Sequence, residues 1–330
     1  MTLPGGWHVL SPIGDPRRSH AVRYHVEDPS GERAFLKAFD FSRAVGAADF
    51  PRAIKEIADA FLHNRNLVQV TGRMDKIVRG LAHGEIKLEG SDWPVMYLIF
   101  ELADGDVRDS LAKAEPVDHV WRLRVLHQAA QALQQLHVHR IYHQNVKPGH
   151  LLNVEAGIKL GDLSSAANAG TVAPLVKDSL PGDAEYAPPE CLYDFEFDAG
   201  NLDRRRQARD MYLFGSLILF LYAQVTTTTA LLNELDFAHH PDATSDSYES
   251  LLPHLQEAFD RVVESLGRDT NAPPELVTSF RELCHPDPRR RGHPRSRAFR
   301  HGSPYSLVRY ISRIGALLKR AEFEERHQAA

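Results

Sequence analysis

Hydrophobic and polar residues alternate in short runs over the first hundred residues, a pattern typical of β-strands with one buried face. These runs are residues 7–13, 21–27, 33–39, 80–88 and 95–101. Turn-forming residues such as Gly14, Pro16 and the stretch 28–31 separate the first three runs. Residues 50–62 instead place apolar side chains at helical spacing. The pattern predicts five strands with one helix inserted after the third.

From residue 106 onward the apolar spacing is mainly helical. Residues 117–137 carry leucines and alanines on or near one face, which predicts a long amphipathic helix. Short strand patterns occur at 151–154 and 158–160, an irregular segment covers 164–183, and helical patterns occupy the rest. The fold class that we expect is therefore α+β, with a small β-rich part followed by a larger helical part.

Composition narrows the classes of function. The chain has 330 residues and a formal net charge of −5, so no nucleic-acid partner is expected on electrostatic grounds. Two cysteines cannot form a disulfide framework, which favours a reducing, cytoplasmic setting. The most apolar run, residues 213–225, is shorter than the roughly 20 residues that a membrane span needs. We therefore expect a buried helix there and no membrane span.

Residues 143–152, His-Gln-Asn-Val-Lys-Pro-Gly-His-Leu-Leu, carry the most informative motif. The segment resembles the catalytic loop of eukaryotic-type Ser/Thr protein kinases, which reads His-Arg-Asp-Leu-Lys-Pro-Glu-Asn. Lys147 matches the family, and it is the residue type found in Ser/Thr kinases. Asn145 stands at the position of the catalytic aspartate, and His150 stands at that of a metal-binding asparagine. The resemblance implies the fold and questions the chemistry.

Further motifs of the same family follow in the family's order. They are Ala-Phe-Leu-Lys at 34–37, Gly-Asp-Leu-Ser at 161–164, Tyr-Ala-Pro-Pro-Glu at 186–190, Asp-Met-Tyr-Leu-Phe-Gly at 210–215 and Pro-Asp-Pro-Arg-Arg-Arg at 286–291. The resemblance implies a bilobal protein-kinase fold, with an N-lobe at 1–103 and a C-lobe with a helical extension at 104–330. It also implies that Arg291 pairs with Glu190.

The resemblance implies a site for ATP and Mg²⁺. Lys37 would grip the α- and β-phosphates, Glu56 on the inserted helix would hold Lys37, and Asp162 would bind Mg²⁺. Leu163 and Ser164 follow Asp162 where the family has phenylalanine and glycine, so a flexible backbone position is lost.

The segment that resembles the glycine-rich loop departs most from the family. Gly14 is the single glycine between residues 13 and 22, and Pro16 removes a backbone amide donor. We therefore expect nucleotide binding to be weakened. The hinge that would face the adenine fits better, with Phe100 at the gatekeeper position followed by Glu101 and Ala103.

Two substitutions in the loop predict impaired catalysis. Asn145 could orient a substrate hydroxyl but cannot accept its proton, and loss of general-base assistance typically costs on the order of 10²–10⁴ in rate. His150 offers a nitrogen to the second magnesium ion, which prefers oxygen ligands. An alternative role for His150 is that of a substitute base. Gln144 replaces an arginine that in the family often binds a phosphorylated activation segment, so regulation by that route is not expected.

Three functions stay open at this point. The favoured one is a pseudokinase or regulatory module that binds ATP and Mg²⁺ and acts on a protein partner. The second is a working Ser/Thr kinase with a protein substrate, either with unorthodox catalytic residues or with Asn145 as an engineered change of a native aspartate. The third is a nucleotide-independent protein-interaction scaffold.

Overall fold

The computed structural model describes residues 1–14, 21–90, 92–113, 118–155, 157–169, 182–298 and 302–328. The described residues form two compact units. The first unit contains Met1–Gly105 and Leu152–Ser164. The second contains Asp106–Leu151 and the described residues from Ser165 onward. Segment 152–164 thus joins the unit built by the start of the chain.

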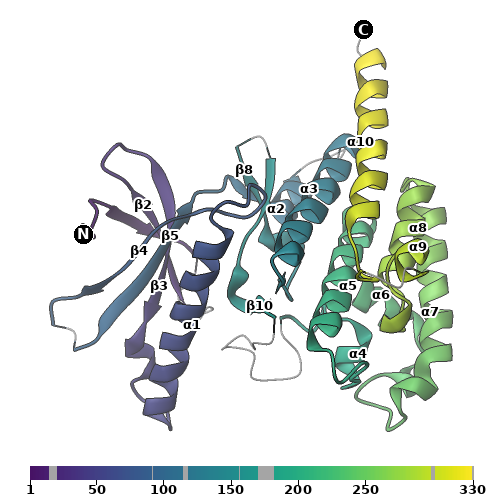
Figure 1. The fold of residues 1–330 in the computed structure, drawn as a ribbon, viewed down its shortest axis with the longest axis horizontal. Helices are drawn as coiled ribbons and strands as arrows, with labels where there is room; N and C mark the ends of the chain where they lie inside the picture. The colour runs from purple at the N-terminus through teal and green to yellow at the C-terminus, as the bar shows by residue number, and fades with distance from the viewer. Residues whose placement is uncertain are drawn as a thin grey trace. The chain divides into compact units, whose positions relative to one another are not determined.

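A five-stranded antiparallel sheet dominates the first unit (Figure 1). Its strands are β1 (His8–Pro12), β2 (Val22–Glu27), β3 (Arg33–Asp40), β4 (Gly80–Lys87) and β5 (Pro94–Glu101), in the spatial order β1-β2-β3-β5-β4. The five predicted strands are confirmed, each within one or two residues at its ends. β3 lies inside the sheet between β2 and β5, so the lysine on this strand is carried by a rigid element.

Helix α1 (Phe50–Thr71) lies between β3 and β4 in the chain and packs against β3, β4 and β5. Asp49 caps its N-terminus by accepting a hydrogen bond from Arg52 N at 3.1 Å. The helix extends nine residues past the predicted end at residue 62. The polar run 63–66 interrupts the apolar pattern, but buried Leu67 and Thr71 continue the packed face beyond it.

Segment 152–164 is held in the first unit by backbone pairing. β8 (Leu151–Val154) and β9 (Gly157–Leu160) form a three-stranded sheet with β6 (Gly105–Asp106), and both predicted strands are confirmed. Leu160 N donates to Lys76 O at 2.8 Å, and Leu160 O accepts from Val78 N at 3.0 Å. This pairing fixes the start of the next turn, which carries Asp162.

The second unit is mainly helical. Its helices are α2 (Val107–Lys113), α3 (His119–Val138), α4 (Pro189–Leu192), α5 (Leu202–Ala223), α6 (Thr227–Glu234), α7 (Tyr248–Asp269), α8 (Pro274–Leu283), α9 (Pro294–Ala298) and α10 (Val308–Gln328). Strands β7 (Ile141–Tyr142) and β10 (Ala167–Asn168) pair antiparallel. α5 forms the centre of the core, and α10 packs along α3 (Figure 1).

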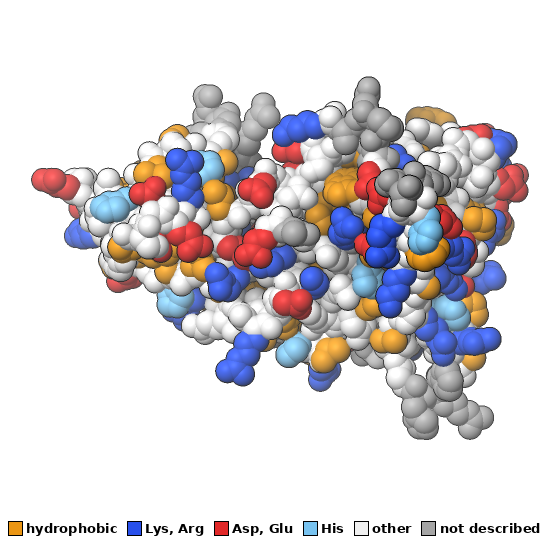
Figure 2. Space-filling view, turned by 90° about the horizontal axis from the view of Figure 1, so that it is seen from above, with side chains coloured by type: hydrophobic (Ala, Val, Ile, Leu, Met, Phe, Trp, Pro, Cys, Tyr) orange, Lys and Arg blue, Asp and Glu red, His pale blue; other side chains and the backbone are white. Residues whose placement is uncertain are grey.

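No single described helix is long and apolar enough to cross a membrane, while α5 and α6 together meet the criterion by length and composition across a 79° bend. Most of α5 is buried in the second unit. On the face shown in Figure 2, acidic and basic side chains are interspersed.

Candidate functional site

The loop at residues 143–150 is anchored to α5 through Asp210. This carboxylate is fully buried and accepts hydrogen bonds from His143 N at 2.9 Å and from Gln144 N at 2.7 Å. It also accepts from Gln144 Nε2 at 3.0 Å and contacts His137 Nε2 at 2.8 Å. A buried carboxylate needs such donors to offset its lost hydration. These hydrogen bonds therefore hold the backbone of the loop against α5.

Gln144 faces inward. Its backbone is left-handed, with φ of 63°, and its side chain is buried. Nε2 donates both to Asp210 and, at 2.9 Å, to Arg206 O. A neutral side chain engaged in this way offers no cationic receptor for a phosphate. The geometry supports the expectation that regulation through such a receptor is absent, and that expectation stays a prediction.

Asn145 and Lys147 are brought together with residues 182 and 183. Lys147 Nζ lies 2.6 Å from Asp183 Oδ2. Gly182 has φ of +93°, and a Cβ placed there would lie 2.8 Å from Asn145 Oδ1. The main chain at Gly182 thus packs directly on the Asn145 side chain. Asp183 was not among the residues expected at the site.

His150 follows in the short 3₁₀ helix Pro148–His150, and its Nδ1 lies 2.9 Å from Asn145 O. Because a carbonyl oxygen only accepts, Nδ1 donates the hydrogen in this contact. No group of three or more His, Cys, Asp or Glu side chains that could hold a metal ion occurs among the described residues. A magnesium ion would therefore need phosphate oxygens or water for most of its ligands, as is usual for Mg²⁺.

Lys37, Asp162 and Ser164 meet in the first unit. Lys37 Nζ lies 3.4 Å from Asp162 Oδ1 and 2.6 Å from Ser164 Oγ. Ser164 Oγ in turn donates to Asp162 Oδ1 at 2.6 Å. Asp162 adopts a left-handed backbone with φ of 52° at the turn after β9. The ammonium group of Lys37 and the carboxylate of Asp162, both predicted to meet a nucleotide, thus contact each other and share the Ser164 hydroxyl as a hydrogen-bond partner.

Glu56 forms an ion pair with Arg52, whereas the expected partner is Lys37. Its carboxylate pairs with Arg52 Nε at 3.1 Å, four residues earlier on α1, whereas Lys37 pairs with Asp162. Residues four apart on a helix are neighbours, so Arg52 is a nearby partner for Glu56. The structure thus pairs Glu56 with Arg52, and it pairs Lys37 with Asp162 and Ser164.

The predicted hinge residue Glu101 has polar partners other than Lys37, Asp162 and Ser164. Glu101 is the last residue of β5. Its two carboxylate oxygens each accept a hydrogen bond from Lys159 Nζ at 2.8 Å, and Oε1 also accepts one from Arg79 N at 2.7 Å. Ala103 follows it outside any strand. Gly14 has φ of +70°, and no described residue lies within 4 Å of a Cβ placed there. Residues 15–20 of the predicted glycine loop lie outside the described part of the chain.

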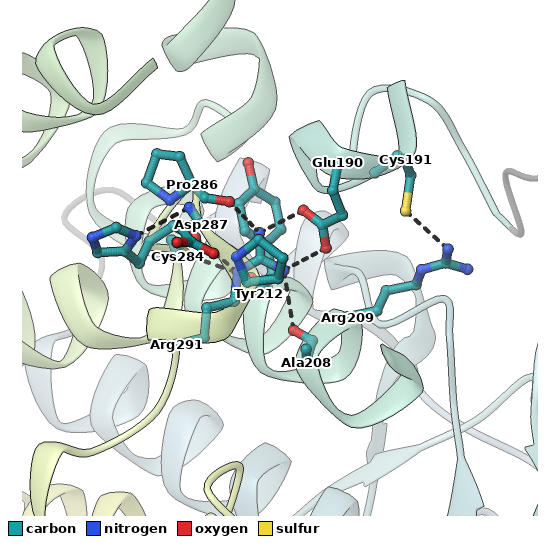
Figure 3. Close-up of polar contacts among 12 residues, drawn as sticks. Glu190, Cys191, Ala208, Arg209, Tyr212, Cys284, Pro286, Asp287 and Arg291 are labelled. Carbon is teal, nitrogen blue, oxygen red and sulfur yellow. Dashed lines mark hydrogen bonds and ion pairs between the residues drawn. The ribbon is translucent and has the colours of Figure 1, made fainter. Parts of the chain in front are cut away.

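The predicted Glu190–Arg291 ion pair is confirmed, and it is bidentate (Figure 3). Both Arg291 Nη atoms lie 2.6 Å from the Glu190 oxygens, and both side chains are buried. The remaining donors of Arg291 reach the backbone oxygens of Ala208, His285 and Pro286. Burial lowers the pKa of Arg291, but the Coulomb attraction and hydrogen bonds of Glu190 raise it by a larger amount. The pKa of Arg291 therefore lies above its ordinary value. The guanidinium stays charged, and this cluster is structural.

The sequence model of the protein kinase domain family matches residues 54–297, well over half of the chain. The chain belongs to the eukaryotic-type protein kinase family. The expected α+β kinase fold is confirmed, and its first and second units are called the N-lobe and C-lobe below.

Several kinases resemble this kinase domain in sequence. The mouse dual specificity protein kinase TTK is 23% identical over 209 residues, covering 62% of this chain and 24% of its own. The Aurora kinase of Schizosaccharomyces pombe is 29% identical over 184 residues, covering 50% of each chain. Mitogen-activated protein kinase 4 of rice (Oryza sativa subsp. japonica) is 32% identical over 128 residues, covering 36% of this chain and 34% of its own. The chain spans half or less of the length of these relatives.

The kinase domain holds two contacts that the sequence did not reveal. The motifs mark Ser164 only as the loss of a glycine and give no role to Asp183, whereas the structure makes them partners of Lys37 and Lys147. In both cases the residue type could have indicated a polar contact, because Ser164 places a hydroxyl and Asp183 a carboxylate at or near a family motif. The roles of the predicted site residues stay predictions.

Proposed function

We propose that this kinase domain binds ATP with Mg²⁺ in its N-lobe, transfers phosphoryl groups poorly, and acts as a regulatory module on a protein partner. The observation that carries the proposal is the Lys37–Asp162 pair, 3.4 Å apart. A cation for phosphates and a carboxylate for magnesium lie together on the N-lobe. The fold family supplies the reason to expect ATP in particular.

The N-lobe residues fit Mg-ATP in their chemistry. Lys37 is largely buried in the middle of β3, and Asp162 is more exposed, with 36% of its side chain accessible. A carboxylate oxygen is the kind of ligand that Mg²⁺ prefers. When bound, Mg²⁺ would neutralise charge on the phosphates. Lys37 would orient those phosphates, and main-chain groups at Glu101 and Ala103 would face the base.

Impaired transfer follows from the C-lobe loop. Asn145 carries an amide where a proton acceptor is needed, and this loss costs on the order of 10²–10⁴ in rate. His150 presents an imidazole where a second magnesium would require an oxygen. The loop is nevertheless well anchored, so the defect is chemical rather than a failure to fold. We also infer a cytoplasmic location, because Cys191 and Cys284 are both free thiols.

A working Ser/Thr kinase is the second candidate, and Asp183 favours it. This carboxylate lies against Lys147, is 54% exposed, and follows the residue packed on Asn145. It would supply the proton acceptor that position 145 lacks. Phosphotransfer by the chain that disappears in Asp183→Asn would support this candidate over the first.

Thermal unfolding with and without Mg-ATP tests the proposal on the full chain. A ligand at 100 times its Kd stabilises the folded state by about 2.7 kcal/mol, so the melting temperature of the wild type should rise clearly. Lys37→Ala should lose the rise. Lys55→Ala, which removes an exposed lysine paired with Asp59, should keep it. Absence of any rise in the wild type, or an equal rise in Lys37→Ala, would leave the nucleotide-independent scaffold as the better reading.

A further inference from the structure

We propose that Ser164, and not Glu56, is the positioning residue that holds Lys37 for the nucleotide phosphates. This inference rests on the proposed nucleotide site and names the device that organises it. Ser164 stands in the segment after Asp162, whereas Glu56 stands on α1. The chain would thus organise its phosphate-binding lysine from the turn after β9.

The distances favour Ser164. Lys37 Nζ lies 2.6 Å from Ser164 Oγ, a short charge-assisted hydrogen bond, and 3.4 Å from Asp162 Oδ1. An ammonium group has three donors. With two of them directed at Ser164 and Asp162, the third can meet a phosphate oxygen without loss of either contact.

The direction of the Ser164 hydroxyl is fixed by its neighbours. A serine hydroxyl has one hydrogen, and the nearest acceptors are Asp162 Oδ1 at 2.6 Å and Asn64 Oδ1 at 3.4 Å. The shorter contact takes the hydrogen, so the lone pairs of Oγ accept from Lys37. Asn64 is itself buried and held by a bond from Nδ2 to Ala60 O at 2.8 Å. The hydroxyl therefore sits between a fixed helix face and the aspartate.

Glu56 is engaged elsewhere. Its ion pair with Arg52 lies on the first turns of α1, at an i,i+4 spacing that helices support. Lys37 receives its anionic partner from Asp162 instead. One serine hydroxyl then links the two charged groups of the nucleotide site, which explains how the site keeps its order without the Lys37–Glu56 pair.

Calorimetric titration of the full chain with Mg-ATP tests this assignment. Ser164→Ala should weaken binding about 3- to 10-fold, the effect of one net hydrogen bond. Ser164→Thr keeps the hydroxyl and should restore most of the affinity. Glu56→Gln, the matched control, should stay within about twofold of the wild type, because the Glu56 carboxylate pairs with Arg52 while Lys37 pairs with Asp162.

A second measurement needs no nucleotide. Acetylation of Lys37 by acetic anhydride, followed by mass spectrometry and referred to Lys55, reports how firmly the ammonium group is held. Ser164→Ala should raise the rate at Lys37 and Glu56→Gln should not. The inference is overturned if Glu56→Gln weakens nucleotide binding or exposes Lys37 as much as Ser164→Ala does. A wild type that binds no Mg-ATP would overturn the proposed function, while the labelling would still decide which residue holds Lys37.

Discussion

At the residue scale, Lys147 in the loop at 143–150 has an anionic partner although position 145 carries an amide. Position 145 carries an amide, but Asp183 places a carboxylate 2.6 Å from Lys147 Nζ. Lys147 thus retains an anionic partner, and the loop retains the anchor at Asp210. An anchored loop with an amide at position 145 is what the proposed function, nucleotide binding without efficient transfer, requires.

Gly182 gives the sharpest prediction at this scale. Gly182→Ala would force an L-residue into φ of +93° and bring its Cβ to 2.8 Å from Asn145 Oδ1. We expect a loss of roughly 1–3 kcal/mol in the free energy of unfolding, from backbone strain and displacement of Asn145. Denaturant unfolding measures it. Gly200→Ala, where nothing lies within 4 Å of the added Cβ, is the control and should change little. Equal stability of the two variants would contradict the described packing of Gly182 on Asn145.

At the scale of elements, the Glu190–Arg291 pair joins the short helix α4 to the segment after α8 (Figure 3). The residues are 101 positions apart in the chain. Tyr212 of α5 packs its ring 4.8 Å from the guanidinium carbon. Two buried charges in bidentate contact fix the distance between these elements. Removal of one charge leaves the other buried without a partner.

Arg291→Met should therefore destabilise the C-lobe by about 3–5 kcal/mol, the usual cost of breaking a buried pair. Arg290→Met, at the exposed neighbouring position, is the matched control and should stay within about 0.5 kcal/mol of the wild type. Urea unfolding of both variants provides the comparison. A loss below 1 kcal/mol in Arg291→Met would show that the pair does not fix this part of the fold as described.

At the scale of the whole molecule, periodicity and motif order predicted the strands, the long helices and the distant Glu190–Arg291 pair. The end of α1 was predicted too early, because burial of Leu67 and Thr71 outweighs the polar run before them. The partners of Lys37 and Lys147 were beyond prediction. Several oxygens compete for each ammonium group, and only tertiary geometry selects Ser164 over Glu56, or selects Asp183.

One single-turnover experiment on the full chain tests the proposed function most directly. The chain is saturated with γ-labelled ATP and Mg²⁺, and bound nucleotide and transferred label are followed together, with a Ser/Thr peptide mixture and water as acceptors. The proposed function predicts bound ATP that persists, with transfer slower by a factor on the order of 10²–10⁴ than the roughly 1–100 s⁻¹ of active kinases. Transfer at the rate of an active kinase, or no retained nucleotide, would contradict it.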